Sequence, residues 1–384
     1  MKNAGHFVGY SSEVIKCPQC DQIVKTTHCI HCAIEVTAPN PEEFPPIVWQ
    51  QIRDHLVREL MIDPQWMVED DDEITWWPGH VPQKIFVSNR VEMEIDGIPQ
   101  TLVRVTIESV LGRATDRSNA LDAVADYMSW YPFGSIVVLD DNRVVALASL
   151  ALNGRNRSVL ALLHHEALVQ ATFAQDISAN LIDDGVVEAN HLIHPSSGRR
   201  DEPDELLQNV YGNESFEPIG SGLVSVRELV RSFWRRSTLQ TSGELGFEND
   251  EITFINFEDG FHCGVGWADD QFFSLKFGPA LLVINYLATY NESFSAEEIN
   301  SLNILIALSP YDLSHIGGIT QQMQANVNTI KHIAVLPHYF LQTAEHALDR
   351  GTITAFNGIL QAIASARYAH SLLHRDAENN STTD

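Results

Sequence analysis

Four of the five cysteines lie between positions 17 and 32, near the N-terminus. Cys17 and Cys20 form one Cys-x-x-Cys pair, and Cys29 and Cys32 form a second pair after the eight intervening residues 21–28. Thiolates are preferred zinc ligands, and four of them complete the tetrahedral coordination of a closed site. The pattern predicts one structural Zn²⁺ bound by these four cysteines, with no open position for a substrate.

Two groups of histidines resemble fragments of metal sites. His164 and His165 are followed by Glu166, and His191 lies three residues before His194. Adjacent residues on a helix point about 100° apart, and the sequence has no His-Glu-x-x-His motif. We therefore expect the first group to lie on the surface of an amphipathic helix, and we assign no metal to either group.

The fifth cysteine, Cys263, lies in a predicted strand between His262 and Gly264. It could act as a nucleophile only if a basic partner approached it, and a lone cysteine is by default a small buried apolar residue. Catalytic groups converge in space rather than in sequence, so a site formed by His262, Cys263, Asp269 and Asp270 stays an alternative. The chain has no phosphate-binding glycine loop, nucleophile elbow or dinucleotide fingerprint.

Trp76 and Trp77 are adjacent at the end of a predicted strand. Successive strand residues face opposite sides of a sheet, so one ring is expected in the core and the other outside it. An exposed tryptophan could anchor a partner peptide. Burial against a neighbouring helix is the favoured interpretation for this pair.

The composition excludes several classes of protein. A length of 384 residues favours two or three domains. The 51 acidic and 24 basic residues give a formal charge of -27, which repels nucleic acid and anionic membranes. The longest apolar stretch, 279–290, is shorter than the roughly 20 residues of a membrane-spanning helix, and residues 1–12 lack a signal peptide. We expect a cytoplasmic protein that binds neither nucleic acid nor a membrane.

Changes in composition divide the chain into a series of segments. A linker rich in proline is expected to be stiff and extended, because proline fixes its own torsion and biases the preceding residue against helix. The predicted segments are a zinc ribbon over 1–36, a proline-rich linker over 37–46, a first α+β domain over 47–178, a linker or long loop over 179–215, a second α+β domain over 216–375, and a disordered tail over 376–384.

Hydrophobic spacing predicts the elements of the first domain. In chain order they are a helix over 47–61, strands over 65–69, 73–77, 84–95 and 100–110, a helix over 117–130, a hairpin over 134–148 and a helix over 157–173. The same rules apply to the second domain. They predict a helix over 224–234, strands over 251–256, 262–267, 271–277 and 280–288, a helix that starts at a capping box of Ser295 and Glu298, and a C-terminal helix over 353–373.

Both domains thus begin with a helix, continue through strands and return to helix. The tetrapeptide Asp-Glu-Ile-Thr occurs at 72–75 and again at 250–253, each time about a dozen residues after the first helix. We therefore expect an α+β fold of two antiparallel sheets flanked by helices, with a duplication as one explanation.

The order of helices and strands over 47–173 resembles the small α+β fold of type III secretion chaperones and of the YbjN family of bacterial regulators. In the second domain, residues 277–283, ahead of the Tyr-Leu-Ala-Thr sequence at 286–289, look like the Gly-x-x-Leu-Leu strand of such domains. The resemblance covers most of residues 47–320. It implies a protein without catalytic residues that holds a partner polypeptide along a sheet or helix surface, often as a homodimer.

The leading hypothesis is a non-enzymatic, cytoplasmic, chaperone-like or regulatory module that carries a structural zinc ion and binds a protein partner. Its acidic surface would select basic segments. One alternative is an enzyme with a site around Cys263. Another is a transcription-associated zinc-ribbon protein, although residues 1–36 balance Lys2, Lys16 and Lys25 against Glu13, Asp21 and Glu35.

Overall fold

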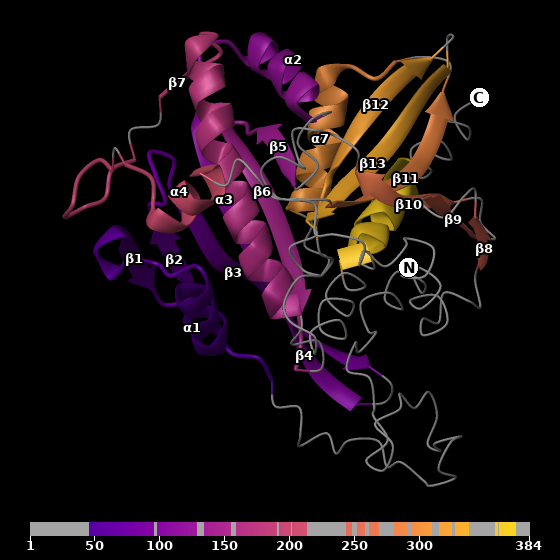
Figure 1. The fold of residues 1–384 in the computed structure, drawn as a ribbon. Coiled ribbons are helices and arrows are strands. Elements are labelled where there is room, and N and C mark those ends of the chain that lie inside the picture. The colour runs from indigo at the N-terminus through magenta and orange to yellow at the C-terminus, as the bar shows by residue number, and fades with distance from the viewer. Residues whose placement is uncertain are drawn as a thin grey trace, which may run out of the picture.

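The computed structural model contains two antiparallel sheets with helices packed against them (Figure 1). The residues that the structure describes are 46–95, 98–128, 134–154, 159–189, 192–200, 202–212, 243–247, 252–257, 261–268, 280–290, 293–308, 315–324, 327–337, 358–359 and 361–373. We call residues 46–212 the first unit and residues 243–373 the second unit. The predicted α+β class is confirmed.

The first unit contains a sheet of seven strands. The strands are β1 (Met67–Asp70), β2 (Glu73–Trp76), β3 (Gln83–Ile95), β4 (Ile98–Ala114), β5 (Ser135–Val138), β6 (Arg143–Leu152) and β7 (Val187–Glu188). Their order is β1-β2-β3-β4-β6-β5, and β7 pairs with β4. The helices are α1 (Trp49–Glu59), α2 (Arg117–Met128), α3 (Val159–Asp183) and α4 (Glu205–Gly212), with a 3₁₀ turn, η3 (Pro64–Trp66).

The second unit contains a sheet of six strands. The strands are β8 (Gly243–Phe247), β9 (Ile252–Phe257), β10 (His262–Ala268), β11 (Ala280–Tyr290), β12 (Gly318–Gln324) and β13 (Val327–Pro337). Helix α7 (Ala296–Ala307) lies between β11 and β12 in the chain, and residues 361–373 are helical. The order of strands is β8-β9-β10-β11-β13-β12, which is the order of β1 to β6 in the first unit.

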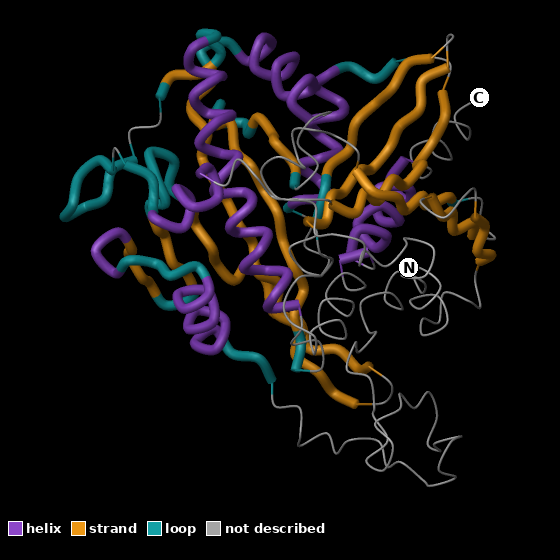
Figure 2. The backbone as a smooth tube through the Cα atoms, in the orientation of Figure 1, coloured by secondary structure: helices purple, strands orange, loops and turns teal. Residues whose placement is uncertain are grey.

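Helix α3 covers one face of the first sheet and crosses β4 and β6 (Figure 2). It is buried along most of its length. Ile85, Ile107 and Leu163 are fully buried members of one core between helix and sheet. Helix α1 packs on the other side of α3. It contributes Trp49, Ile52 and Leu56, whose spacing by three and four residues gives the helix one apolar side.

The predicted helix over 157–173 is too short. Helix α3 continues to Asp183 because the apolar spacing continues through Ala174, Ile177 and Leu181, all of which are buried. It ends in a Schellman motif, in which Gly185 adopts a positive φ of 71° and the Val186 amide donates to the Leu181 carbonyl at 2.9 Å. The predicted linker over 179–215 therefore contains the end of α3, together with β7 and α4.

Of three further predictions, one is confirmed and two fall outside the described residues, and the structure also contains two strands that were not predicted. The capping box of Ser295 and Glu298 is confirmed at the start of α7. Strands β12 and β13 were not predicted, because the sequence of β12, Gly-Ile-Thr-Gln-Gln-Met-Gln, contains few apolar residues. The predicted helix over 224–234 and the predicted strand over 271–277 lie outside the described residues. None of the described helices is both long and apolar enough to cross a lipid bilayer.

Buried polar side chains join the two units. The Ser135 hydroxyl of β5 donates to Asn303 Oδ1 of α7 at 2.8 Å, and the Val138 amide donates to Asn300 Oδ1 at 2.8 Å. His315 lies 2.8 Å from the same Ser135 hydroxyl through Nε2. Its backbone pairs with Ser149 of β6, since each amide donates to the other carbonyl, at 2.7 and 2.8 Å. Sheet hydrogen bonding therefore continues from one unit to the other.

Arg104 adds a charged contact at the same junction. Its guanidinium donates to the Ser149 hydroxyl at 2.9 and 3.0 Å and to the Ala307 carbonyl at 2.6 Å. Ala307 is the last residue of α7, where the exposed carbonyls carry partial negative charge. The cation of the first unit thus stabilises the C-terminal end of a helix in the second.

We predict that Asn303→Ala lowers the free energy of unfolding by about 2–4 kcal/mol. The Asn303 amide accepts from Ser135 and from the Ile319 amide, and it donates to the Ile319 carbonyl, so its removal leaves buried partners without hydrogen bonds. Urea denaturation measures the loss. Asp122→Ala on the exposed side of α2 is the control, with an expected change within about 0.5 kcal/mol. Equal stability of both variants would contradict a structural role for Asn303.

Candidate functional site

A groove lies between α1 and the start of α3. It has a volume of about 330 Å³ and is lined by Ile47, Gln51, Asp54, His55, Arg58 and Leu160. Gln51 lies three and four positions before Asp54 and His55, and Arg58 lies four and three positions after them, so the four residues form a single polar stripe along α1. The apolar part of the lining comes from Ile47 and Leu160. The groove begins where the chain leaves the predicted proline-rich linker.

Two histidines meet at the inner wall of this groove. His55 Nε2 lies 3.0 Å from His164 Nδ1 and 3.0 Å from the Leu160 carbonyl. Arg58 Nη2 lies 3.3 Å from His55 Nδ1. Arginine can only donate, so His55 Nδ1 accepts, and the ring proton of His55 sits on Nε2. That proton is shared between Leu160 and His164, which leaves His164 Nδ1 as an acceptor.

The histidines of this cluster are neutral at pH 7. Burial, together with the nearby His55, lowers the pKa of His164 to about 4. Burial also lowers the pKa of His55, and it lowers the pKa of His165 well below its usual value. The rings of His164 and His165 lie only 4.1 Å apart, so charge on both would be costly.

Glu166 is the next residue on α3 and is completely buried. Neither of its carboxyl oxygens has a hydrogen-bond partner among the described residues. Burial raises the pKa of Glu166 well above its usual value, so the side chain stays protonated. The expectation that residues 164–166 lie on the surface of an amphipathic helix is wrong for Glu166, which is buried, whereas His164 and His165 are half-buried. Helix α3 is covered by the sheet on one side and by α1 on another, which a single amphipathic pattern does not reveal.

The predicted zinc ligands Cys17, Cys20, Cys29 and Cys32 lie outside the described residues. Within the described parts of the chain, no cluster of three or more histidine, cysteine, aspartate or glutamate side chains has the geometry to hold a metal. The zinc prediction therefore rests on the spacing of the cysteines.

Cys263 is fully buried in β10, and burial raises the pKa of its thiol. A nucleophile needs a thiolate that a substrate can reach, so this position is unsuited to nucleophilic chemistry. Neighbouring His262 is exposed, and its Nδ1 lies 2.8 Å from Asn256 Oδ1. The other residues of that alternative site, Asp269 and Asp270, lie outside the described residues.

Both tryptophans of the 76–77 pair are buried, so the expectation that one ring lies outside the core is wrong. The favoured interpretation is confirmed as to burial, but Trp77 contacts a loop rather than a neighbouring helix. Trp76 donates from Nε1 to Gln83 Oε1 at 3.0 Å inside the core. Trp77 packs edge-on against His194 with ring centroids 4.8 Å apart, and its Nε1 donates to the Leu192 carbonyl at 3.3 Å. His194 is thus part of the packing beneath a loop, and His191 lies outside the described residues.

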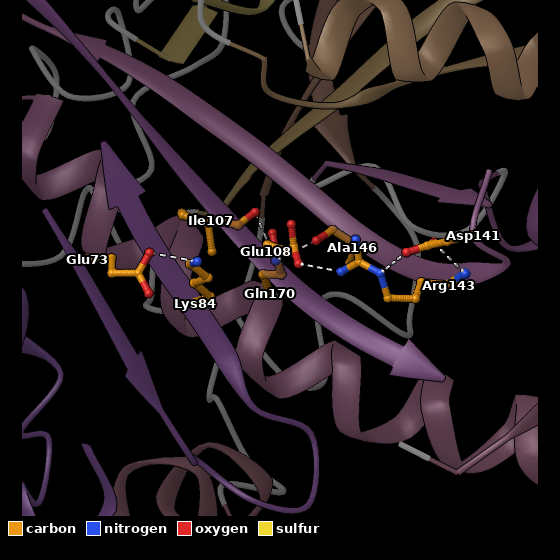
Figure 3. A network of polar contacts seen from close by, with 8 residues as sticks. All are labelled: Glu73, Lys84, Ile107, Glu108, Asp141, Arg143, Ala146 and Gln170. Carbon is orange, nitrogen blue, oxygen red and sulfur yellow. Dashed lines mark hydrogen bonds and ion pairs between the residues drawn. The ribbon is translucent and has the colours of Figure 1, made fainter. Parts of the chain in front are cut away.

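The outer face of the first sheet carries a chain of ion pairs (Figure 3). Lys84 of β3 contacts Glu73 of β2 at 2.6 Å, and Arg143 of β6 bridges Glu108 of β4 at 3.2 Å and Asp141 at 2.7 Å. These side chains are partly exposed. Exposed pairs of this kind contribute at most about 1 kcal/mol each to stability.

Sequence reasoning missed the groove. The helix over 47–61 was predicted, and its polar residues are visible in the sequence. What the sequence did not show is that Leu160 and His164, more than 100 residues away, lie beside that stripe.

Comparison of the chain with models of protein families, with curated proteins and with solved structures gives no match. The likeness to type III secretion chaperones and to the YbjN family therefore remains a prediction from the order of elements.

We predict that His164→Gln changes how stability depends on pH. The pKa of this histidine is lower in the folded state than in the unfolded state, so its contribution is complete above about pH 6.5 and is lost as the pH falls towards about 4. The variant lacks this loss. Relative to the variant, the wild-type chain should lose about 2 kcal/mol between pH 7.5 and 4.5, measured by urea denaturation.

Gln51→Ala is the matched control for this experiment, because it changes a side chain of the same groove that does not titrate. Its difference from the wild type should stay constant over the same range. Parallel curves for His164→Gln and the wild type would contradict the assignment of a buried neutral imidazole.

Proposed function

We propose that this chain is a non-enzymatic protein-interaction module, chaperone-like or regulatory, whose partner polypeptide docks in the groove between α1 and α3. The observation that carries the proposal is the lining of the groove. Ile47, which is almost fully buried, and half-buried Leu160 form the apolar wall, whereas exposed Asp54 and Arg58 supply charges of both signs. Apolar surface with a charged rim is typical of surfaces that bind protein segments.

The histidines beside the groove argue against acid–base catalysis. A general base works best with a pKa near the working pH and with a proton acceptor aimed at the substrate. His164 has a pKa of about 4, and its Nδ1 already accepts from His55. The proton of His55 is likewise engaged inside the protein. These rings hold α1 against α3, and the groove keeps its shape for a ligand.

The proposal includes a structural zinc ribbon ahead of the two α+β units and a cytoplasmic setting. The chain leaves the proline-rich segment 37–46 at Ile47, which lines the groove. A zinc unit tethered there would lie near any polypeptide bound between α1 and α3. The acidic chain, with a formal charge of -27, favours partners with basic segments.

We also propose that the two units arose by duplication. Each sheet has a meander of four strands, then a helix, then a hairpin whose second strand returns beside the fourth. The repeated Asp-Glu-Ile-Thr tetrapeptide falls at the second strand of each order, β2 and β9. A match of four residues is short enough to arise by chance, so the shared order of strands is the stronger support.

Site-specific photo-crosslinking tests the docking site. A benzophenone amino acid at position 51, in the groove, should crosslink to a defined partner protein in cells that produce the full chain. The same probe at position 122, exposed on α2, should not. Adding Asp54→Lys to the position 51 probe removes a rim carboxylate that would attract a basic segment, and should lower the yield several-fold. Equal yields at both positions, or no effect of Asp54→Lys, would refute the groove as the docking site.

Metal analysis tests the zinc ribbon. We expect about one zinc ion per purified chain and less than about 0.1 in the Cys29→Ser/Cys32→Ser variant, since a tetrahedral site that loses half its thiolates binds zinc weakly. Cys263→Ser is the matched control and should keep its zinc, because that cysteine is buried in the second unit. Full zinc content in the double variant would exclude this ligand set.

A further inference from the structure

The helix between the fourth and fifth strands occupies the same place in both units. In the first unit this helix is α2, and in the second it is α7. Each helix packs on the edge strand of its own sheet, α2 on β5 and α7 on β12. Each also packs on the edge strand of the other sheet, α2 on β12 and α7 on β5.

Two further contacts fit the same pattern: helix α2 contacts α7, and strand β5 contacts β12. If α2 is exchanged for α7 and β5 for β12, these contacts map onto themselves or onto one another. Helix α7 also contacts β6, and α2 makes no equally extensive contact with the corresponding strand β13. This reciprocity defines an isologous interface, in which the same patch is used on both sides of a twofold axis.

Apolar side chains of both units pack across this contact. From α7, Ile304 and Ala307 pack on Val137 and Leu147 of the first sheet. From the first unit, the apolar cluster around α2 receives Leu282 of β11 and Ala296 of α7. Each helix therefore lies between its own sheet and the other unit.

A glycine permits the close approach of the two edges. A Cβ atom on Gly318 of β12 would lie 3.1 Å from the Gly134 carbonyl oxygen, and it would overlap the end of the Met128 side chain of α2. Gly318 is not in the left-handed region, so a larger side chain there would be opposed by the neighbouring unit and not by backbone strain.

We infer that the two units form an internal pseudo-twofold dimer, in which each unit is the partner that covers the α2–β5 or α7–β12 face of the other. One chain then completes an assembly that would otherwise need two copies. The occupant of this face is a repeat of the same chain. A second chain has no place on it, and the protein is a monomer with respect to this interface.

Gly318→Val in the full chain tests the inference by placing a branched side chain between the units. Hydrogen exchange should become at least about tenfold faster in α2 and in α7 together, while strands β1 and β2 stay unchanged. Thr320→Val, two residues further along β12, is the matched control and should leave both helices protected. Sedimentation should show the wild-type chain at the mass of one chain over the micromolar range.

Charge reversal supplies a second variant in case Gly318→Val does not fold. Arg117 at the start of α2 pairs with Glu297 in the first turn of α7 at 2.9 Å. Arg117→Glu should speed exchange in both helices several-fold, and adding Glu297→Arg should restore protection. Faster exchange in one helix alone, no rescue, or a wild-type dimer whose dilution deprotects α2 and α7 would overturn the internal dimer.

Discussion

The hydrogen bonds between α7 and the edge of the first sheet fix how the two halves of this molecule sit together. His315 Nε2 faces the Ser135 hydroxyl, which donates to Asn303, and Asn303 holds both backbone groups of Ile319. Because Asn303 Oδ1 receives the serine proton, His315 must donate its own proton to Ser135. Burial lowers the pKa of His315 well below its usual value, which suits a neutral ring with that proton on Nε2.

Polar contacts of this kind contribute little net stability, since the same groups bond to water in the unfolded chain. Their effect is on geometry. A buried hydroxyl or amide that loses its partner costs about 1–3 kcal/mol, so arrangements of the two sheets that break this chain of bonds are disfavoured. Apolar contacts around α2 and α7 supply attraction between the units, and the hydrogen bonds of the Asn300 and Asn303 side chains select one orientation. The first unit, which contains the groove, is thus fixed in position relative to the second unit.

Several buried polar side chains of helix α3 also form hydrogen bonds to backbone groups outside the helix. Gln170 donates to the Ala146 carbonyl, Gln175 bonds both backbone groups of Val81, and Ser178 donates to the Leu111 carbonyl. Each of these buried polar side chains ties the helix to the sheet. Glu166, one turn before Gln170, has no such partner among the described residues and remains a neutral acid. Buried groups without partners are rare in folded proteins. Glu166 follows His165 in α3, near the contact with α1, and it would carry a negative charge there if it lost its proton.

The sequence predicted most of the described helices and strands, because their apolar residues follow the period of the element that they form. It predicted the capping box of α7 from two residues three positions apart. It did not reveal the groove, because His55 and His164 are brought together by a contact between helices far apart in the chain. It also misplaced Glu166, since a carboxylate is expected in water unless it is paired. The hydrophobic pattern of a sequence indicates which residues share one face of a helix or strand. It does not indicate which other element covers that face.

The internal pairing of the units narrows where a partner can bind. Helices α2 and α7 are each enclosed between two sheets, so they offer less surface than a helix packed on one sheet only. Helix α1 contacts α3 on one side and leaves Gln51, Asp54 and Arg58 facing the groove. The outer face of the first sheet, with its alternating charges, is divided between solvent and α7. A polypeptide that docked in the groove as proposed would meet side chains that already form hydrogen bonds within the protein, such as Asp54 and Arg58. Little of its binding energy would then be spent on ordering them.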